Sequence, residues 1–210
     1  MQKSLVGMLA VVGTLAVAAP AMSQACIGNP NGALGVFAGG RAATSDGDQR
    51  FGVEGGLRIP GGIGVSAGLD IYQGEDGADD VNEFFVRGAL ETASLGLFVG
   101  PRVSACPTLE VRRAEIDEFG SFTRIPVGVG IAAQLSTLIG PSIHGYAVPQ
   151  VVFSRFSSDS DLVDDETETD LGIRGGAILG FGTFYLGGEV GHVFRDETDP
   201  SVTLRAGLKL

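Results

Sequence analysis

The sequence ends with Ser201-Val-Thr-Leu-Arg-Ala-Gly-Leu-Lys-Leu210, where apolar and polar residues alternate without interruption. Successive side chains of a β-strand point to opposite sides, so this stretch predicts a strand with one apolar and one polar face. The apolar face would carry Val202, Leu204, Ala206, Leu208 and Leu210. An unpaired edge on such a strand is prone to aggregation. We therefore expect a second strand to pair with it and close a sheet.

The same two-faced alternation recurs along the chain before this last strand. Ten strands are predicted, over about residues 33–42, 50–59, 63–72, 83–91, 95–106, 121–135, 141–156, 171–181, 183–194 and 201–210. Pro149 lies inside one of them, and proline has no N–H to donate to a strand ladder. We expect a bulge or a bend at that position.

The connections between these strands alternate in length. Those after the first, third, fifth, seventh and ninth strands are longer and mostly acidic, and include residues 107–120 and 159–170. The others are short and rich in Gly, Pro or Ser, so all long loops would lie at one end. An even number of two-faced strands of about ten residues is typical of a transmembrane β-barrel.

A lipid bilayer accepts only helices and closed sheets, because unpaired backbone groups are costly in hydrocarbon. The sequence therefore predicts an all-β fold, a closed antiparallel up-and-down transmembrane β-barrel of ten strands. Eight strands is the alternative count. A secreted soluble β-sandwich is the alternative fold, since its strands alternate in the same way.

The N-terminal residues resemble a removable export signal. Lys3 supplies a positive charge, an apolar run extends from Leu5 to Ala19, and small residues precede Cys26. This order of features is typical of a secretory signal peptide. We predict a signal peptide over residues 1–25 and a single barrel domain over 26–210; a retained transmembrane helix is the alternative.

The terminal stretch from Val202 to Leu210 resembles the C-terminal assembly signal of the small outer-membrane β-barrel proteins of diderm bacteria. The match departs at Leu210, where that family usually has Phe. The resemblance implies export to the cell outer membrane, contact with outer-membrane lipid, and recognition of the last strand by the barrel-assembly machinery. The family includes structural anchors, adhesins, narrow pores and lipid-modifying enzymes, so the resemblance does not select one activity.

Charged residues recur on the polar face of the predicted strands, which would face the barrel lumen. They are Arg50, Glu54, Arg58, Asp70, Arg87, Arg102, Arg124, Arg174, Glu189, Arg205 and Lys209. Sequestered charges must pair or stay hydrated. We expect a salt-bridged, largely filled lumen and hence a structural or surface-interaction protein. A narrow passive pore that prefers anions is the alternative, because arginines dominate the set.

Signals for catalysis are weak. His144 and His192 are the only histidines, and the strand directions place them near opposite ends of the barrel. Neither belongs to a recognisable catalytic motif, so we expect no enzyme and no cofactor; an outer-membrane lipid-modifying enzyme is the second alternative. The formal net charge of −11 disfavours nucleic acid as a partner.

The acidic residues 159–170 lack the glycine and the ligand spacing of an EF-hand. We predict a solvated loop and no dedicated metal site there. Divalent cations that bridge these acidic loops to neighbouring lipid head groups are a further hypothesis.

Cys26 and Cys106 form an even pair, which favours a disulfide in an oxidising compartment. Cys26 precedes the first strand at the short-turn end, whereas Cys106 faces inward on the fifth strand. A bridge would draw the N-terminal segment into the lumen. The sequence therefore predicts that this segment forms a small plug.

Overall fold

The computed structural model describes residues 25–30, 35–45, 48–59, 62–73, 81–96, 100–116, 120–136, 141–158, 165–195 and 198–210. The predicted signal peptide lies almost wholly outside these residues. A short 3-10 helix, η1 (Ala25–Ile27), precedes the strands. The strands are β1 (Val36–Ser45), β2 (Asp48–Ile59), β3 (Ile63–Gln73), β4 (Val81–Leu90), β5 (Ala93–Gly96), β6 (Gly100–Ile116), β7 (Gly120–Ser136), β8 (Ser142–Ser157), β9 (Glu166–Phe181), β10 (Phe184–Val193) and β11 (Ser201–Lys209).

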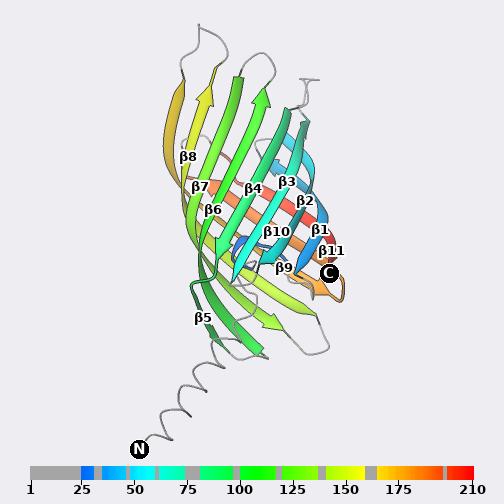
Figure 1. Ribbon diagram of the computed structural model, residues 1–210. Helices are drawn as coiled ribbons and strands as arrows, with labels where there is room; N and C mark the ends of the chain where they lie inside the picture. The colour runs from blue at the N-terminus through cyan, green and yellow to red at the C-terminus, as the bar shows by residue number, and fades with distance from the viewer. Residues whose placement is uncertain are drawn as a thin grey trace, which may run out of the picture.

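The strands form one closed antiparallel ring (Figure 1). The last strand pairs with the first, from Phe37 opposite Lys209 to Thr44 opposite Val202. The pairing of β4 with β6 closes the other side of the sheet. The predicted closure by the C-terminal strand is confirmed, and the alternative β-sandwich is wrong because this sheet has no second layer.

β4 and β5 together occupy one position in the barrel wall. Ala89 lies opposite Thr108 on β6, whereas Ala93 lies opposite Ala105. Three residues of the fourth barrel strand therefore face two residues of β6. This one-residue excess is a β-bulge, which bends a strand without ending it. The eleven labelled segments thus make ten barrel strands, as the alternation predicts.

Several predicted loops are strands. β6 extends to Ile116 and β9 begins at Glu166, inside the segments 107–120 and 159–170. The short turn expected between the predicted strands 83–91 and 95–106 is also wrong, because β5 spans residues 93–96 and continues the same barrel strand. Outward side chains near the ends of the long strands are polar, Arg113 and Glu115 among them. The alternation of polarity disappears there although the hydrogen-bonded ladder continues.

Of the bulge or bend predicted at Pro149, the bulge is absent from β8. The register between β7 and β8 is the same on both sides of Pro149, with the pairs nearest to it missing. On the other side Pro149 lies opposite Ile173 of β9 without a shift. Val148 and Val152 are both buried, so the alternation of β8 is regular and its inward face is simply apolar at these positions.

The outer surface of the barrel is an apolar band. Outward side chains such as Val53, Val129 and Leu204 are half to two-thirds exposed. Phenylalanines mark both borders of the band: Phe51, Phe84, Phe153 and Phe194 toward the long-loop end, and Phe181 and Phe184 at the opposite end. Among the described residues, no helix is long and apolar enough to cross a membrane.

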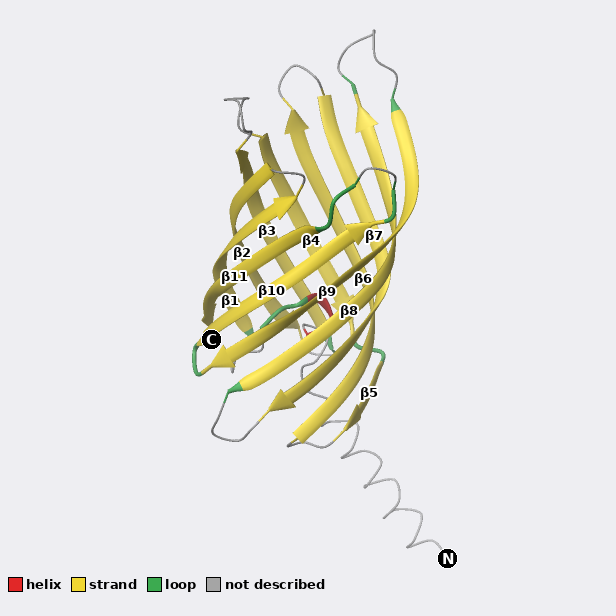
Figure 2. Cartoon of the chain, turned by 180° about the vertical axis from the view of Figure 1, so that it is seen from behind, coloured by secondary structure: helices red, strands yellow, loops and turns green. Residues whose placement is uncertain are grey.

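The core of the molecule is the lumen. Buried rings such as Phe37, Phe85 and Tyr146 point inward together with buried charged residues. η1 lies inside the ring of strands and contacts β4, β6, β7 and β8 (Figure 2). Gly68 illustrates the tight fit, since a Cβ atom there would lie 2.4 Å from the Phe85 ring.

Candidate functional site

The N-terminal segment occupies the lumen near the short-turn end. Cys26 and Ile27 are fully buried, and a disulfide joins Cys26 to Cys106 of β6 with 6.1 Å between their Cα atoms. A Cβ atom on Gly130 of β7 would lie 2.8 Å from the Cys26 carbonyl oxygen, so glycine permits this close approach. The segment is the plug that the two cysteines predict.

Two lumen arginines hold the backbone of this plug. Arg87 Nη1 donates a hydrogen bond to the Ile27 carbonyl oxygen at 3.0 Å. Arg205 Nη1 donates to the Gly28 carbonyl oxygen, also at 3.0 Å. A charged donor makes a hydrogen bond stronger than a neutral one. The plug is therefore fixed by a covalent bond and by two charge-assisted hydrogen bonds.

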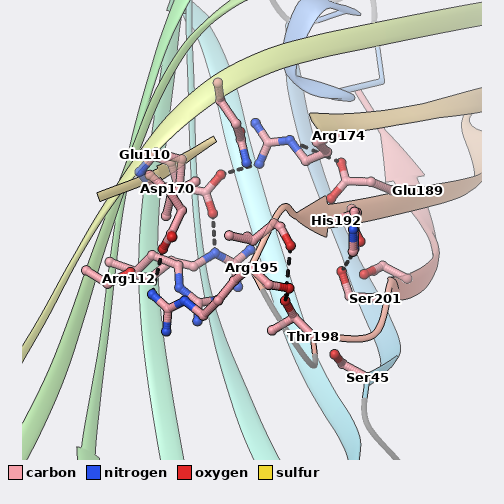
Figure 3. A pocket seen from close by; sticks show the side chains of 18 of the residues that line it. Ser45, Glu110, Arg112, Asp170, Arg174, Glu189, His192, Arg195, Thr198 and Ser201 are labelled. Carbon is pink, nitrogen blue, oxygen red and sulfur yellow. Dashed lines mark hydrogen bonds and ion pairs between the residues drawn. The ribbon is translucent and has the colours of Figure 1, made fainter. Parts of the chain in front are cut away.

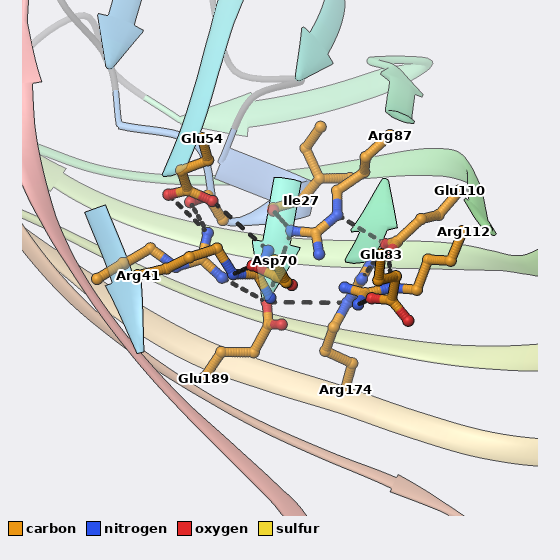
Figure 4. Close-up of polar contacts among 12 residues, drawn as sticks. Ile27, Arg41, Glu54, Asp70, Glu83, Arg87, Glu110, Arg112, Arg174 and Glu189 are labelled. Atoms are coloured by element: carbon orange, nitrogen blue, oxygen red, sulfur yellow. Dashed lines mark hydrogen bonds and ion pairs between the residues drawn. The ribbon is translucent and has the colours of Figure 1, made fainter. Parts of the chain in front are cut away.

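Glu110 is the centre of the ion network beside the plug (Figure 4). Its carboxylate accepts hydrogen bonds from Arg87 at 2.7 Å, from Arg112 on the same strand, and from Arg174 of β9. These contacts join β4, β6 and β9 across the lumen. A buried carboxylate with three guanidinium partners has its charge well compensated, which is the condition for burying an ion.

Glu189 of β10 is a second acceptor. Arg205 donates to its carboxylate at 2.9 Å, and the Tyr146 hydroxyl donates to the same oxygen. Arg87 and Arg174 lie within 4 Å of that oxygen, at 3.8 and 3.9 Å. Glu110 and Glu189 therefore share two arginines, which makes a single connected network.

The network extends toward β1, β2 and β3. Arg41 lies 3.2 Å from Asp70 and 3.9 Å from Glu54. Glu54 in turn lies 3.7 Å from Arg205. The guanidinium carbon of Arg41 lies 4.6 Å from the centroid of the Phe85 ring, a cation–π contact. Strands far apart in the sequence are thus tied together through their inward side chains.

A fifth acidic group, Glu83 of β4, extends the network toward the long-loop end. Arg112 Nη1 donates to Glu83 at 2.5 Å, and the Tyr72 hydroxyl donates to the same carboxylate at 2.9 Å. Arg50 Nη1 donates to the Tyr72 hydroxyl at 3.1 Å. Arg50 therefore joins the network through a tyrosine instead of through a direct ion pair.

The structure unites most of the lumen charges expected from the sequence. Those that meet in the connected network are Arg50, Glu54, Asp70, Arg87, Arg174, Glu189 and Arg205. Arg102 lies elsewhere, 3.5 Å from Glu91 near the short-turn end. Arg124 stacks on the Phe122 ring. Within the described part of the chain, Arg58 and Lys209 form no ion pair with a side chain.

Four charged members of the network are missing from the sequence-based set: Arg41, Glu83, Glu110 and Arg112. Arg41 and Glu83 fall on the polar face of their predicted strands, so alternation alone could have included them. Glu110 and Arg112 fall in the segment that was expected to be a loop. The alternation of polarity in this segment could have found them. Thr108, Glu110 and Arg112 point inward, whereas the apolar residues between them, Leu109 and Val111, point outward.

A cavity of about 160 Å³ lies on the long-loop side of the network (Figure 3). Six arginines line it against four acidic residues, so its wall carries net positive charge. The arginines are Arg41, Arg50, Arg112, Arg124, Arg174 and Arg195. Thr198 of the β10–β11 connection and Ser201, the first residue of β11, are also part of the wall, which places the cavity toward the long-loop end.

The outer band and the lumen are opposite in chemistry. Leu204 and Val53 face outward, whereas their sequence neighbours Arg205 and Glu54 are buried inside. An apolar exterior with an ionic interior in a closed antiparallel sheet is the reverse of a soluble protein and is the pattern of barrels built for lipid. The chain therefore has the architecture of a transmembrane β-barrel.

No known protein family and no curated protein matches the sequence. Solved structures with a similar fold include LpxR from Salmonella typhimurium, at 13% identity and a TM-score of 0.49 over 78% of this chain and 73% of that one. The N-terminal β-barrel domain of Pseudomonas aeruginosa OprF matches at 11% identity and a TM-score of 0.40, over 85% and 99%. The KdgM porin in complex with oligogalacturonate matches at 13% identity and a TM-score of 0.34, over 82% and 96%. These likenesses concern the barrel fold only.

Proposed function

We propose that the protein is an outer-membrane β-barrel that acts as a structural or surface-interaction protein with a closed lumen. The observation that carries this proposal is the plug: Cys26 is bonded to Cys106 inside the barrel, and two buried arginines hold the plug backbone. Beside it, Glu110, Glu189 and their arginines fill the middle of the lumen. The apolar band would contact lipid, and the long-loop end would face outward as the interaction surface.

The proposal includes no catalysis. His144 is buried near the start of β8, and His192 near the end of β10 packs edge-on against Phe194 with 5.1 Å between ring centroids. The two histidines therefore lie toward opposite ends of the barrel and share no site. A general base must lie within hydrogen-bonding reach of the proton that it removes, so these two histidines cannot act on the same substrate group.

Export by the N-terminal signal and recognition of β11 by the assembly machinery are parts of the same proposal. Nucleic acid is not a proposed partner. Divalent cations at the acidic connections are less favoured, because Asp165 already accepts a hydrogen bond from Arg155 at 3.0 Å. That bond lowers the pKa of Asp165. Arg195 likewise pairs with both Glu168 and Asp170.

The conductance of the folded protein in planar bilayers tests the closed lumen. A heat-modifiability gel first shows that the purified chain is folded. We expect no discrete current steps from the wild type. Anion-selective steps would favour the narrow pore instead, and a change in the mass of outer-membrane lipid A that depends on the protein would favour a lipid-modifying enzyme.

A substitution on the outer face tests the contact with lipid. Leu204 lies in the middle of β11 and is 61% exposed. We expect Leu204→Arg to lower the free energy of unfolding by about 2–4 kcal/mol, because a charge at the bilayer midplane is costly. Leu208→Arg, nearer the end of the strand, should cost about 0–1 kcal/mol. Urea unfolding in lipid vesicles measures both, and equal losses would contradict the proposed depth.

A further inference from the structure

Two arginines face each other across neighbouring strands in the part of the lumen near the long-loop end. Arg112 of β6 lies directly opposite Arg124 of β7, and both side chains line the cavity. Like charges directly opposite in an antiparallel pair are destabilising. Arg50 is close enough to interact electrostatically with Arg124 as well. The cavity wall therefore concentrates positive charge at one point.

The acidic side chains near this point compensate only part of that charge. Arg112 is paired with Glu83 and Glu110. Arg124 instead stacks on the Phe122 ring, with its guanidinium carbon 5.1 Å from the ring centroid. Among the residues that the structure describes, neither Arg50 nor Arg124 forms an ion pair. Two cationic groups at the cavity are thus left without a directly paired carboxylate, and Glu83, the acidic group whose charge reaches both, is already paired with Arg112.

Several donors at this cavity also lack an acceptor. The Nε–H groups of Arg50 and Arg124 are buried and donate to no acceptor within the described residues. The Nε atom of Arg174, whose side chain is buried and lines the same cavity, also has no hydrogen-bond partner there. Ser154, which lies opposite Arg124 on β8, adds a buried hydroxyl to the wall. Buried donors normally have partners, so their absence needs an explanation.

We propose that this cavity binds a single phosphate or sulfate group, with Arg50, Arg112 and Arg124 as its principal ligands. An oxyanion supplies both the missing negative charge and the missing acceptors, and the planar guanidinium fork matches its geometry. The cavity of about 160 Å³ is smaller than the roughly 300 Å³ or more of a pocket for a drug-sized ligand. One anionic group fits, and a larger carrier would remain outside.

This binding site goes beyond the proposed closed lumen, and it is measured by binding instead of by conductance. A conducting barrel could hold the site, and a closed barrel could lack it. The phosphate could belong to a small solute or to a lipid head group. Because the cavity lies toward the long-loop end, which the proposed function places on the outer side, we expect a soluble phosphate ester, and the experiment distinguishes the two sources.

The test is calorimetric titration of the full processed chain, folded in nonionic detergent, with inorganic phosphate and with sulfate at constant sodium chloride. We expect one bound ion per barrel. Arg124→Gln should weaken binding at least tenfold, and Arg124→Lys, which keeps the charge but loses the fork, should weaken it severalfold. The matched control is Arg113→Gln, the outward neighbour of Arg112, whose side chain is 57% exposed. It removes the same charge and should change affinity less than twofold.

Competition then identifies the source of the phosphate. Displacement of inorganic phosphate by glycerol 3-phosphate supports a soluble ester, and displacement only by phosphatidic acid in mixed micelles supports a lipid head group. Heat modifiability shows that each variant is folded, and Arg124→Lys keeps the test decisive where Arg124→Gln does not fold. Absence of phosphate and sulfate binding by the wild type, or an equal loss in Arg113→Gln, would overturn the proposal.

Discussion

Replacing Glu110 by glutamine is expected to lower the free energy of unfolding of the barrel by about 3–5 kcal/mol, the usual cost of breaking a buried ion pair from one side. Glu110 accepts hydrogen bonds from Arg87, Arg112 and Arg174, and its side chain is only 2% exposed. The glutamine amide keeps the shape but loses the charge. Three buried guanidinium groups would then face an uncharged side chain that brings its own donors.

The matched control for this change lies on the same strand. Glu115 of β6 is paired with Arg113 at 3.7 Å, but its side chain is 76% exposed. Glu115→Gln should therefore change stability by about 0–1 kcal/mol. Urea unfolding followed by circular dichroism or by gel mobility measures both variants. Equal stabilities of Glu110→Gln and the wild type would show that the network does not stabilise the barrel.

A second variant tests the reason for the loss. In Glu110→Gln combined with Arg174→Gln, the number of unpaired guanidinium groups falls by one. The double variant should then be less destabilised than the sum of the two single changes, because the residues share a direct contact. Strictly additive effects would mean that Glu110 and Arg174 act independently.

Removing the plug is expected to convert a barrel that conducts no ions into one that conducts them. Deletion of residues 26–30 together with Cys106→Ser removes the disulfide, the buried Ile27 side chain and the two backbone carbonyls held by Arg87 and Arg205. The vacated space lies among small and aromatic side chains, including Ala89, Ala132 and Tyr146. Water and ions should enter it, and discrete current steps should appear in planar bilayers.

The double variant Cys26→Ser with Cys106→Ser separates the covalent from the non-covalent part of the closure. It keeps the plug and the hydrogen bonds from Arg87 and Arg205, each worth about 1.5–3 kcal/mol for a charged donor. We expect rare, brief openings in this variant and frequent openings after the deletion. If the deletion variant folds but shows no current steps, the side-chain network alone closes the lumen.

Much of the fold follows from the alternation along the chain. The inward positions of Arg87, Glu189 and Arg205 and the closure of β11 on β1 are readable from it. The prediction fails where polarity no longer differs between the two faces. Arg113 and Glu115 point outward near the end of β6 and are polar, so the segment resembles a loop although it is a strand. At Val148 and Val152 the reverse holds, because the inward face is apolar.

The candidate site was less predictable than the fold. Glu110 and Arg112 were excluded with the segment that contains them, and no local pattern shows that Arg112 meets Arg124 of the next strand. The disulfide was predictable because the chain has only two cysteines. The alternation of polarity after Leu90 does not distinguish a bulge from a turn.

The sequence by itself determined which side chains face lipid-like surroundings and which face inward, because the two-residue period is a property of the extended backbone and does not depend on what packs against it. Only the tertiary structure decided which inward charges meet. Contacts such as Glu110 with Arg174, or Arg205 with Glu54, cross the lumen between strands far apart in the sequence. Their partners depend on how the strands tilt and stagger when the sheet closes, which no single strand encodes.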